Sequence, residues 1–579
     1  MHPSIASLLL CLLLASALAA ADAEVEAAGA VDLSPDRSLW AVTESQLSLA
    51  DSLPEAVDIS AVSHGEFDEQ FSPSESAVPV FDGNDRTVWG RLPLRNDREV
   101  PVAINVVIKY TFFERIDWYW RESDGRTQQS SAGQRVPMPA GASPSRFPMA
   151  EFVVAPGETR VLYFKVRSDT LIVMPIRVYE HAEWVASETL DLMALGIFVG
   201  CLFTMFLVGS LFYLTFRSPA FLWFGAYCLI SIVYLGLTSG VGKAYFWPGS
   251  TSTLLQPLWL VMGVALIINV FFVSAFLKTR EHAPRYHRLL MAVAAVSVLV
   301  CLNDPLPLWL SGLVFVVATG LGPIAILGGA LVLWLRGVSG AGLIVISWIP
   351  YQIGLMWAYL RSFDLVPYFD GNHYTMPVTS TLTALAFMWA LHRQSSQAEH
   401  EATHDQLTDL PNSTLFDRRI SQSNQQSGRS VGVMQIDLDG FKSINDTFGH
   451  SAGDFVLQTV ADRLRSVCGS NGDAFRTGGD EFIVLCHRRT RKEDVEALAN
   501  AIVEEISKPI DYNGDELAVG ASVGLAYPVE SRESILSAID EADAALYEAK
   551  ARGKGQVATA ASFGEPLHNR RSSDANPAT

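Results

Sequence analysis

The chain has 579 residues, which is too long for one ordinary domain, so two or three folded units are expected. Hydrophobic residues make up 49% of it, and its formal net charge is −19 at pH 7. So acidic a chain is unsuited to binding DNA or RNA polymers, which depends on clustered Lys and Arg. The six cysteines have the spacing of neither a disulfide framework nor a metal site.

Residues 1–21 have the pattern of a secretory signal peptide. The stretch SIASLLLCLLLASALAA is an apolar centre followed by small residues, and Ala19-Ala20-Ala21 is one candidate cleavage triplet. An uncleaved anchor helix is the alternative, because the segment before the apolar centre carries little positive charge. In both cases the following segment is delivered to the outside.

Residues 22–188 are predicted to form an outer domain of β-sandwich type. Residues 22–62 are acidic and weakly periodic, which indicates a flexible or loosely packed lead-in. Short alternating runs such as TVWGRLPLRN follow, separated by Gly, Pro, Asn and Asp. Pro156-Gly157 stands between two such runs and predicts a hairpin. We expect an antiparallel sandwich of the jelly-roll kind.

This region resembles the extracellular sensory domain of bacterial seven-transmembrane receptors that carry diverse intracellular signalling modules. The resemblance depends on Trp89-Gly90-Arg91 with Asn96, on Arg146-Phe147-Pro148, and on Met174-Pro175. It implies an unidentified small ligand, with carbohydrates as one candidate class, bound at the jelly-roll face. The aromatic cluster Trp118, Tyr119 and Trp120 could stack on a sugar, and the alternative is that these rings serve packing.

Residues 189–392 contain apolar runs in series, most of them long enough to cross a hydrocarbon core of about 30 Å. A series of this kind favours a seven-helix transmembrane bundle over buried helices of a soluble protein. The fourth run is short and ends at Asn303-Asp304-Pro305. The runs are residues 190–216, 219–239, 257–277, 289–303, 309–335, 341–360 and 374–391.

The positive charges between the runs predict the orientation. Loops assigned to the inside carry Arg217, Lys278, Arg280, Arg285, Arg288, Arg336 and Arg393, whereas outer loops carry only Lys243 and Arg361. This asymmetry predicts an N-terminus outside and a C-terminus inside, in contact with the lipid of a bacterial inner membrane. No acid or base inside the runs indicates ion transport, while a small-molecule pocket among the spans remains open.

The part after the last run is predicted to be a helical connector, residues 393–404, followed by a compact cytosolic α/β domain, residues 405–558, and a disordered tail, residues 559–579. Within the domain, strands are expected at residues 431–437, 473–476, 481–486 and 517–527, and helices at residues 452–467, 493–507 and 533–551.

The stretch RTGGDEFIVL suggests a nucleotide site. Gly478 and Gly479 can form a tight turn whose backbone lies close to a ligand. Asp480 and Glu481 then lie at a strand edge, where hard oxygen donors suit Mg²⁺. A second apolar strand ends at Asp437. Two acidic strand ends, with Lys442 in reach, predict metal-assisted phosphoryl chemistry on a nucleoside triphosphate.

Residues 403–557 resemble a diguanylate cyclase domain, named for the Gly-Gly-Asp-Glu-Phe signature at 478–482. The resemblance implies an antiparallel-centred sheet flanked by helices, related to the palm of polymerases. The supporting motifs are Asp405-Gln-Leu-Thr408-Asp-Leu410-Pro-Asn412, Asp437-x-Asp-x-Phe441-Lys442-x-Ile-Asn445-Asp446, Phe448-Gly449-His450, Gly453-Asp454, Ala545-Leu546-Tyr547 and Ala549-Lys550.

The resemblance also implies roles for individual residues. Asp437, the carbonyl of Leu438 and Asp480, helped by Glu481, would bind Mg²⁺ or Mn²⁺. Asp480 would accept the proton of the GTP 3′-hydroxyl, and Lys442 would stabilise charge on the phosphates. Guanine would be read by Asn445 and Asp454 near His450, and Lys550 would hold the γ-phosphate. The remaining residues assigned to the GTP site are Phe441, Gly478, Gly479 and Lys554, the last at a position where arginine is commoner.

Several of these residues have structural alternatives. Asn445 and Asp446 could cap the start of a helix. Lys550, Arg552 and Lys554 would complement a helix C-terminus without any ligand. His450 could be structural, and Arg476 could pair locally with an acid.

The chain departs from the family pattern at three places. Ser413 replaces an arginine and Gly555 an asparagine. Gly469-Ser-Asn-Gly472 stands where many members have the Arg-x-x-Asp of an inhibitory product site, so no such site is expected.

The function implied is a ligand-responsive receptor that condenses two GTP into cyclic di-GMP and two pyrophosphates. Each domain would hold one GTP, so catalysis would need a homodimer. The alternative is a catalytically silent receptor whose output domain only binds nucleotide or a partner protein. An undamaged signature favours catalysis.

Overall fold

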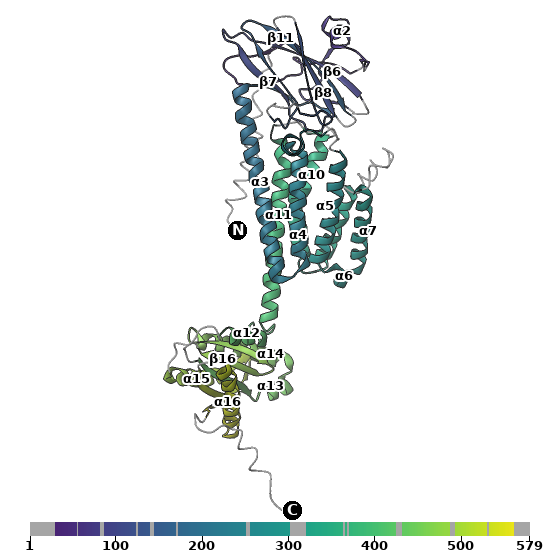
Figure 1. The fold of residues 1–579 in the computed structure, drawn as a ribbon. Coiled ribbons are helices and arrows are strands. Elements are labelled where there is room, and N and C mark those ends of the chain that lie inside the picture. The colour runs from purple at the N-terminus through teal and green to yellow at the C-terminus, as the bar shows by residue number, and fades with distance from the viewer. Residues whose placement is uncertain are drawn as a thin grey trace, which may run out of the picture. The chain divides into compact units, whose positions relative to one another are not determined.

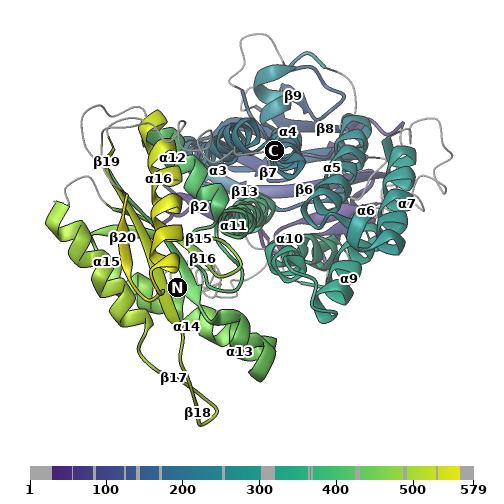
Figure 2. The same cartoon turned by 90° about the horizontal axis from the view of Figure 1, so that it is seen from below.

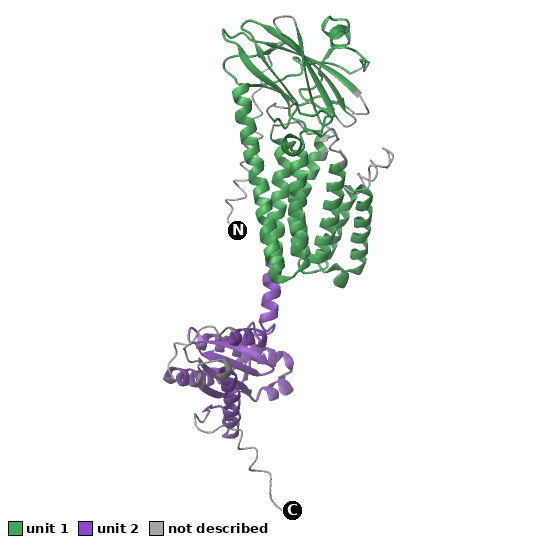
Figure 3. Ribbon diagram, viewed as in Figure 1, with its two compact units in different colours: residues 1–392 green, residues 393–579 purple. Residues whose placement is uncertain are grey.

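The computed structural model describes residues 29–560 apart from 52, 55, 82–85, 123–125, 139–143, 169–171, 251–254, 302–319, 363–364, 367–369, 424–430, 487–491 and 530–531. The chain divides into two compact units, residues 1–392 and residues 393–579 (Figure 3). The predicted signal peptide, Asn303-Asp304-Pro305, the start of the fifth apolar run and nearly all of the predicted tail lie outside the described residues.

The N-terminal part of the first unit is rich in β-structure (Figure 1). Its larger sheet has the strand order β4-β3-β6-β11-β8-β9, with β1 paired to β6, and its smaller sheet has the order β10-β7-β13-β2. A further pair joins β5 and β12. The strands are β1 (Val31–Asp32), β2 (Leu39–Ala41), β3 (Ser48–Ala50), β4 (Ser72–Pro73), β5 (Val80–Phe81), β6 (Arg86–Arg95), β7 (Val102–Ile108), β8 (Arg115–Arg121), β9 (Thr127–Ala132), β10 (Met149–Val154), β11 (Thr159–Ser168), β12 (Ile172–Val173) and β13 (Ile176–Glu180), with a short helix α2 (Ile59–Ser63).

The two sheets enclose one core because their strands alternate. Along β11 every second side chain is buried, among them Leu162 and Phe164, while the residues between are partly exposed. These side chains share a cluster with Ile104 and Val106 of β7, which lies in the other sheet. The predicted β-rich outer region is therefore confirmed.

The predicted loose lead-in and the predicted hairpin are both wrong in part. Strands β1 to β3 lie within residues 22–62, and Leu33 and Leu47 there are fully buried, so this stretch belongs to the core. The turn at Pro156-Gly157 exists, with a Glu158 N–H to Ala155 carbonyl bond of 3.1 Å. However, β10 pairs with β7 whereas β11 pairs with β6 and β8. The turn therefore carries the chain from one sheet to the other.

The aromatic cluster on β8 serves packing. Trp118 is fully buried against Phe164, with ring centroids 5.6 Å apart, so its ring cannot stack on a sugar. Tyr119 stacks on Trp89 at 5.9 Å. Trp120 stacks on Phe152 at 5.4 Å.

The rest of the first unit is helical. Five helices of the described part are long and apolar enough to cross a membrane: His181–Phe216, Pro219–Thr238, Pro257–Phe276, Pro284–Cys301 and Ala341–Ala358. The apolar helix Gly322–Leu335 is shorter. The elements are α3 (His181–Phe216), α4 (Pro219–Thr238), α5 (Leu255–Phe276), α6 (Thr279–His282), α7 (Pro284–Cys301), α9 (Gly322–Leu335), α10 (Ala341–Ser362), the 3-10 helix η4 (Asp370–Tyr374) and α11 (Thr375–Thr403).

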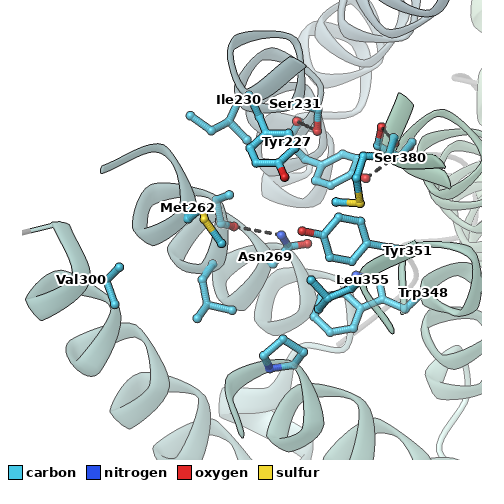
Figure 4. A pocket seen from close by; sticks show the side chains of 15 residues that line it. Tyr227, Ile230, Ser231, Met262, Asn269, Val300, Trp348, Tyr351, Leu355 and Ser380 are labelled. Carbon is cyan, nitrogen blue, oxygen red and sulfur yellow. Dashed lines mark hydrogen bonds between the residues drawn. The ribbon is translucent and has the colours of Figure 1, made fainter. Parts of the chain in front are cut away.

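The helices pack into a bundle, which Figure 2 shows nearly end-on. Aromatic side chains fill its centre: Phe387 of α11 lies 4.5 Å from Phe272 of α5 and 5.5 Å from Tyr227 of α4, between ring centroids. The bundle also contains a small cavity of about 70 Å³ (Figure 4). Asn269 lies at that cavity and donates to its own helix, to the carbonyl of Ala265 at 2.9 Å.

The second unit is an α/β domain around a sheet of order β15-β16-β14-β19-β20. Each strand and helix predicted there is confirmed. The short helices α12 and α13, the hairpin β17–β18 and the edge strand β20 were not predicted. The elements are α12 (Ser413–Ser423), β14 (Val431–Asp439), α13 (Phe441–Phe448), α14 (His450–Cys468), β15 (Gly472–Gly478), β16 (Glu481–Cys486), α15 (Lys492–Ile506), β17 (Ile510–Tyr512), β18 (Asp515–Leu517), β19 (Gly520–Val529), α16 (Arg532–Ala551) and β20 (Val557–Thr559).

Candidate active site

The two acidic strand ends meet at one edge of the sheet. Strand β14 is central and apolar, and it runs antiparallel to β16 with Asp437 opposite Glu481. The backbone N–H of Leu438 donates to the carbonyl of Asp480 at 3.3 Å. The backbone therefore places Asp437, Leu438 and Asp480 side by side, as the sequence predicts.

The turn between β15 and β16 has a left-handed backbone at Gly479 and open space at both of its glycines. Gly479 has φ +50°, a left-handed conformation that glycine adopts without strain. A Cβ built on Gly478 or Gly479 would meet no atom within 4 Å, so protein packing does not require either glycine. The turn thus leaves open space in front of the acidic pair, where a ligand could approach the backbone.

Lys550 reaches the site from the last turn of α16. Its Nζ lies 2.7 Å from Oδ2 of Asp437, and the side chains are 35% and 16% exposed. Lys550 thus contacts a predicted metal ligand, so its place at the site does not depend on the helix dipole alone. Arg552 instead pairs with Glu548 at 3.0 Å, within its own helix. Lys554 is exposed and has φ +66°.

Asp439 connects its own strand to two other chain segments by hydrogen bonds. Its Oδ2 accepts hydrogen bonds from Ser522 Oγ at 2.7 Å and from the Gly555 N–H at 2.9 Å. Its Oδ1 is buried and has no hydrogen-bond partner among the described residues. Gly555 has φ +60°, which asparagine also tolerates, so the departure at this position keeps the backbone shape. The sequence gives no signal for Ser522, which lies 83 residues away.

The residues predicted to read guanine lie on two neighbouring helices. Asn445 is half-buried on α13, while His450 and Asp454 are exposed on the first turns of α14. A Cβ on Gly453 would lie only 2.0 Å from Oδ1 of Asn445, so Asn445 sits directly against α14.

The helix α13 carries several of the residues named in the sequence motifs. Asn445 and Asp446 cannot cap a helix start, because α13 begins at Phe441 and ends at Phe448. Lys442 is exposed on the first turn of α13, and Phe441 packs against the domain core.

Arg476 ties the signature turn to the start of the domain. Its Nη1 lies 2.6 Å from Oδ1 of Asp405, and its Nη2 and Nε donate to the Gly479 carbonyl at 2.8 and 3.2 Å. Burial raises the pKa of Asp405, but hydrogen bonds from Thr408 and Arg476 outweigh it and lower that pKa below its ordinary value. Arg476 therefore pairs with an acid, as one of its alternatives held, but this acid lies 71 residues away and is not local.

The donor chemistry at this edge fits a hard divalent cation. No cluster of three or more His, Cys, Asp and Glu side chains that could hold an ion by itself occurs in the described parts of the chain. Mg²⁺ commonly takes only one or two protein carboxylates and completes its shell with substrate phosphates and water. Asp437, Asp480 and the Leu438 carbonyl provide such a partial set of oxygen donors.

Three family models match successive parts of the chain. The model described as "7TMR-DISM extracellular 2" matches residues 45–180, and "7TM diverse intracellular signalling" matches residues 191–394. The model described as "Diguanylate cyclase, GGDEF domain" matches residues 402–556, which contain all the site residues discussed above.

Among similar proteins, the bifunctional diguanylate cyclase/cyclic di-GMP phosphodiesterase MucR of Pseudomonas aeruginosa is 39% identical over 169 residues, 28% of this chain and 24% of MucR. Diguanylate cyclase TpbB of P. aeruginosa is 33% identical over 28% of this chain and 39% of its own length. The chain thus spans well under half the length of these relatives. An uncharacterized 19.3 kDa protein of Streptomyces ambofaciens is 37% identical and is covered over 95% of its length.

Several solved structures that match contain GGDEF domains. The crystal structure of the coiled coil and GGDEF domain of DgcB from Caulobacter crescentus, in complex with c-di-GMP, is 30% identical, with a TM-score of 0.28 over 31% of this chain and 95% of that one. The GGDEF domain of TpbB from P. aeruginosa is 34% identical, with a TM-score of 0.26 over 27% and 94%. The family models, together with the 37% identical relative that is covered over 95% of its length, show that the chain belongs to the GGDEF-domain proteins, as a member that joins this domain to a 7TMR-DISM transmembrane region and its extracellular domain, and its homologues are diguanylate cyclases.

Proposed function

We propose that the protein is a ligand-responsive membrane receptor whose GGDEF domain condenses two GTP into cyclic di-GMP and two pyrophosphates. One observation carries this proposal: the intact signature turn brings Asp480 beside Leu438 and Asp437, with open space in front of its glycines. A domain that served only as a binding module would not need both acids at adjacent strand ends.

The chain's own residues would position and activate GTP. Gly478 and Gly479 would let the triphosphate lie against the backbone, while Asn445 and Asp454 hold the guanine edge near His450 and Phe441. A bound Mg²⁺ or Mn²⁺ would polarise the phosphates, held by Asp437, Asp480, the Leu438 carbonyl and Glu481. Lys442 and Lys550 would offset the charge that develops on the phosphate oxygens, with Lys554 at the rim.

The bond-forming step needs two copies of the domain. The 3′-hydroxyl oxygen of one GTP would attack the α-phosphorus of the other, the bond to pyrophosphate would break, and the hydroxyl proton would pass to Asp480. The same step in the opposite direction closes the ring. Because each domain would hold one GTP, the active form would be a homodimer.

The chain would have an outer domain of jelly-roll topology, followed by seven membrane spans. The five long apolar helices, together with Gly322–Leu335 and α11, support this arrangement. The excess of Lys and Arg in alternate loops favours an outer N-terminus and a cytosolic C-terminus in a bacterial inner membrane. A cleaved signal peptide would start the export of the outer domain.

The signal would pass through α11. This single helix contains nearly all of the last predicted span, 374–391, and nearly all of the predicted connector, 393–404. A change in span packing would thus reach the start of the cyclase domain along one helix.

The deciding experiment uses membranes that contain the full-length protein, incubated with GTP and Mg²⁺. Wild type should form cyclic di-GMP, and Asp480→Ala should lose at least a hundredfold of that activity, because both the metal and the proton acceptor are affected. Asp462→Ala, an exposed acid on α14, is the matched control and should keep wild-type activity. Equal product from wild type and Asp480→Ala would contradict the proposal, and absence of product from a folded wild type would favour the silent receptor.

We also propose that this enzyme lacks feedback through the loop at Gly469–Gly472. That loop joins α14 to β15 and offers neither the arginine nor the aspartate of the usual inhibitory motif. Added cyclic di-GMP should therefore inhibit only in competition with GTP. Non-competitive inhibition that disappears when this loop is mutated would contradict this statement.

A further inference from the structure

A larger cavity lies where the outer β-region meets the helices of the first unit. It has a volume of about 270 Å³, compared with about 70 Å³ for the cavity inside the bundle (Figure 4). A cavity of about 150 Å³ suffices to hold benzene in a well-studied case, so this one has room for an aromatic ring with a substituent. Its walls come from the segments after β7 and before β10, and from α3, α4, α10, η4 and α11.

One wall of this cavity is a buried ionic cluster. Arg146 of the outer region donates from Nε and Nη2 to both carboxylate oxygens of Glu188 on α3, at 2.7 and 2.8 Å. Asp191, one turn further along α3, lies 3.7 Å from Lys109 Nζ and 3.5 Å from Arg146 Nη2. The side chains of Lys109 and Arg146 are only 5% and 3% exposed. Burial of this many charges at one place costs desolvation free energy, which their ion pairs and hydrogen bonds must offset.

Asn372 gives this cavity a hydrogen-bond donor without a protein partner. Its Oδ1 accepts from Trp357 Nε1 at 2.9 Å, and because an indole N–H can only donate, this bond fixes which end of the amide is oxygen. The Nδ2 is buried and has no hydrogen-bond partner among the described residues, and Asn372 as a whole is 7% exposed. A donor that is desolvated and unpaired costs free energy, which a ligand oxygen would recover.

The charges of the lining favour an anion. Lys109, Arg146 and Arg361 carry positive charge, whereas Asp191 in the lining and Glu188, the partner of Arg146, offset two of these charges, which leaves one cation in excess. Most of the other lining side chains are apolar or aromatic, including Tyr110, Phe112 and Leu195. The cavity therefore combines cations and a free donor with a large apolar wall.

We propose that this cavity binds a small organic carboxylate with an aromatic or acyl body, the carboxylate accepting from Asn372 and lying near Arg361. The site differs from the sheet face expected from the family resemblance. It also lies at the start of the proposed signal path, because the Tyr374 hydroxyl, one residue before α11, donates to Asp191 of α3. The proposal rests on the receptor part of the proposed function and is independent of cyclase activity.

The test measures binding to the full-length protein in lipid nanodiscs, without GTP, by ¹⁹F NMR. The probe is 4-(trifluoromethyl)phenylacetate, and the uncharged comparison is 4-(trifluoromethyl)phenethyl alcohol, which has the same ring. Empty nanodiscs correct for partition into lipid. Wild type should bind the carboxylate saturably and at least tenfold more tightly than the alcohol. Equal affinity, or no saturation, would overturn the proposal, and an inactive cyclase domain would leave the result unchanged.

Two substitutions locate the bound probe. Asn372→Asp keeps an acceptor for Trp357 but replaces the free donor by a carboxylate, so the carboxylate probe should bind at least tenfold more weakly. Arg361→Gln should weaken it similarly, and neither change should alter alcohol binding by more than twofold. The matched controls are Asn500→Asp on α15 and Arg95→Gln in a surface ion pair of the outer region, which should both bind as wild type.

The remaining outcomes also decide. If either variant fails to fold, the melting temperature of wild type is measured with the carboxylate probe and with the alcohol. The carboxylate should raise it more than the alcohol does, and equal rises would overturn the proposal. Competition by phenylacetate or by decanoate distinguishes a water-soluble source from a membrane-derived acyl chain. Displacement by either one supports the site, and displacement by neither overturns it.

Discussion

At the scale of single residues, Arg476 joins the signature turn to the start of the GGDEF domain. It bonds Asp405 at the start of the domain and the carbonyl of Gly479 inside the signature turn. Its own backbone N–H donates to the Pro411 carbonyl at 2.9 Å. One side chain thus holds the turn that carries Asp480 against the segment that follows the connector.

We predict that Arg476→Ala lowers cyclic di-GMP formation at least tenfold, because the Gly479 carbonyl loses two donors and the turn loosens. The domain should lose about 1–3 kcal/mol of stability, as expected when a partly buried charged partner is removed. Product formation and limited proteolysis of the full-length protein check both effects. Lys508→Ala, which removes an exposed pair with Glu505, should cost about 0–1 kcal/mol and leave activity unchanged. Similar effects of the two substitutions would argue against a positioning role for Arg476.

The sequence could predict the strand-end acids but not the residues that support them. Asp437 lies near the end of one apolar strand and Asp480 just before another, so the pattern places both acids at strand ends. The pairing of these two strands across residues 440–480 is set by the fold. Asp439 depends on Ser522 and on the backbone of Gly555, which come from distant segments and have no local signature. Arg476 had several acids within reach by sequence, and only the fold selects Asp405.

At the scale of elements, two glycines mark close contacts of different kinds. A Cβ at Gly453 on α14 would lie 2.0 Å from Oδ1 of Asn445, the end of a side chain that can move. A Cβ at Gly524 on β19 would lie 2.0 Å from the Ala542 carbonyl oxygen and 2.3 Å from the Leu546 nitrogen, which belong to the backbone of α16.

These contacts predict different effects for replacement of each glycine by alanine. Gly453→Ala should leave stability nearly unchanged, since alanine favours a helix, but should raise the KM for GTP several-fold by displacing Asn445. Gly524→Ala should destabilise the domain by about 3 kcal/mol or more, because α16 would have to shift from the sheet. Initial rates against GTP concentration and thermal melts separate the two. A Gly453→Ala enzyme with normal KM would contradict the predicted place of Asn445 in the GTP site.

The ends of α14 and β16 carry two cysteines that report on the packing of the domain. Burial raises the pKa of Cys468 and of Cys486 to about 12 each. A pKa near 12 instead of 9 lowers the reactive thiolate fraction at pH 8 about a thousandfold. We predict that neither thiol reacts with a maleimide reagent until the domain unfolds, as peptide mass spectrometry would check. Rapid labelling of either thiol in active protein would show that α14 or β16 opens locally.

Elements were predicted best where their own pattern decides them. The long amphipathic helices and buried strands of the GGDEF domain follow from periodicity. The local turn between β10 and β11 predicts a hairpin. Their actual pairing partners are determined by the packing of the core that both sheets share. Short elements such as α13 and β20 are held by tertiary contacts and leave little trace in the pattern.

At the scale of the whole molecule, the proposed signal path runs through α11. Its 29 residues run without a break through the boundary between the two units. An α-helix turns once in about 3.6 residues, so inserted residues rotate whatever follows.

We predict that cyclic di-GMP production in membranes depends on the length of an insert in the connector. Seven residues of alanine-rich helix after Gln397 complete nearly two turns and should change the basal rate less than twofold. Two residues rotate the following segment by about 200° and should change it more than fivefold. The same two residues added after Thr579 are the control. Equal rates of cyclic di-GMP production for all inserts would argue against helix rotation as the signal.

The junction of β13 and α3 has a consequence for how the outer domain moves. The strand ends at Glu180 and the helix begins at His181, so no loop residue separates them, and Arg146 clamps the first turns of that helix through Glu188. The outer sheets therefore lack a free swivel on this side. The fluorescence polarisation of a fluorophore attached rigidly to these sheets should therefore decay slowly, at the rate at which the membrane-embedded region rotates. It should not decay on the nanosecond timescale of a small domain on a flexible tether.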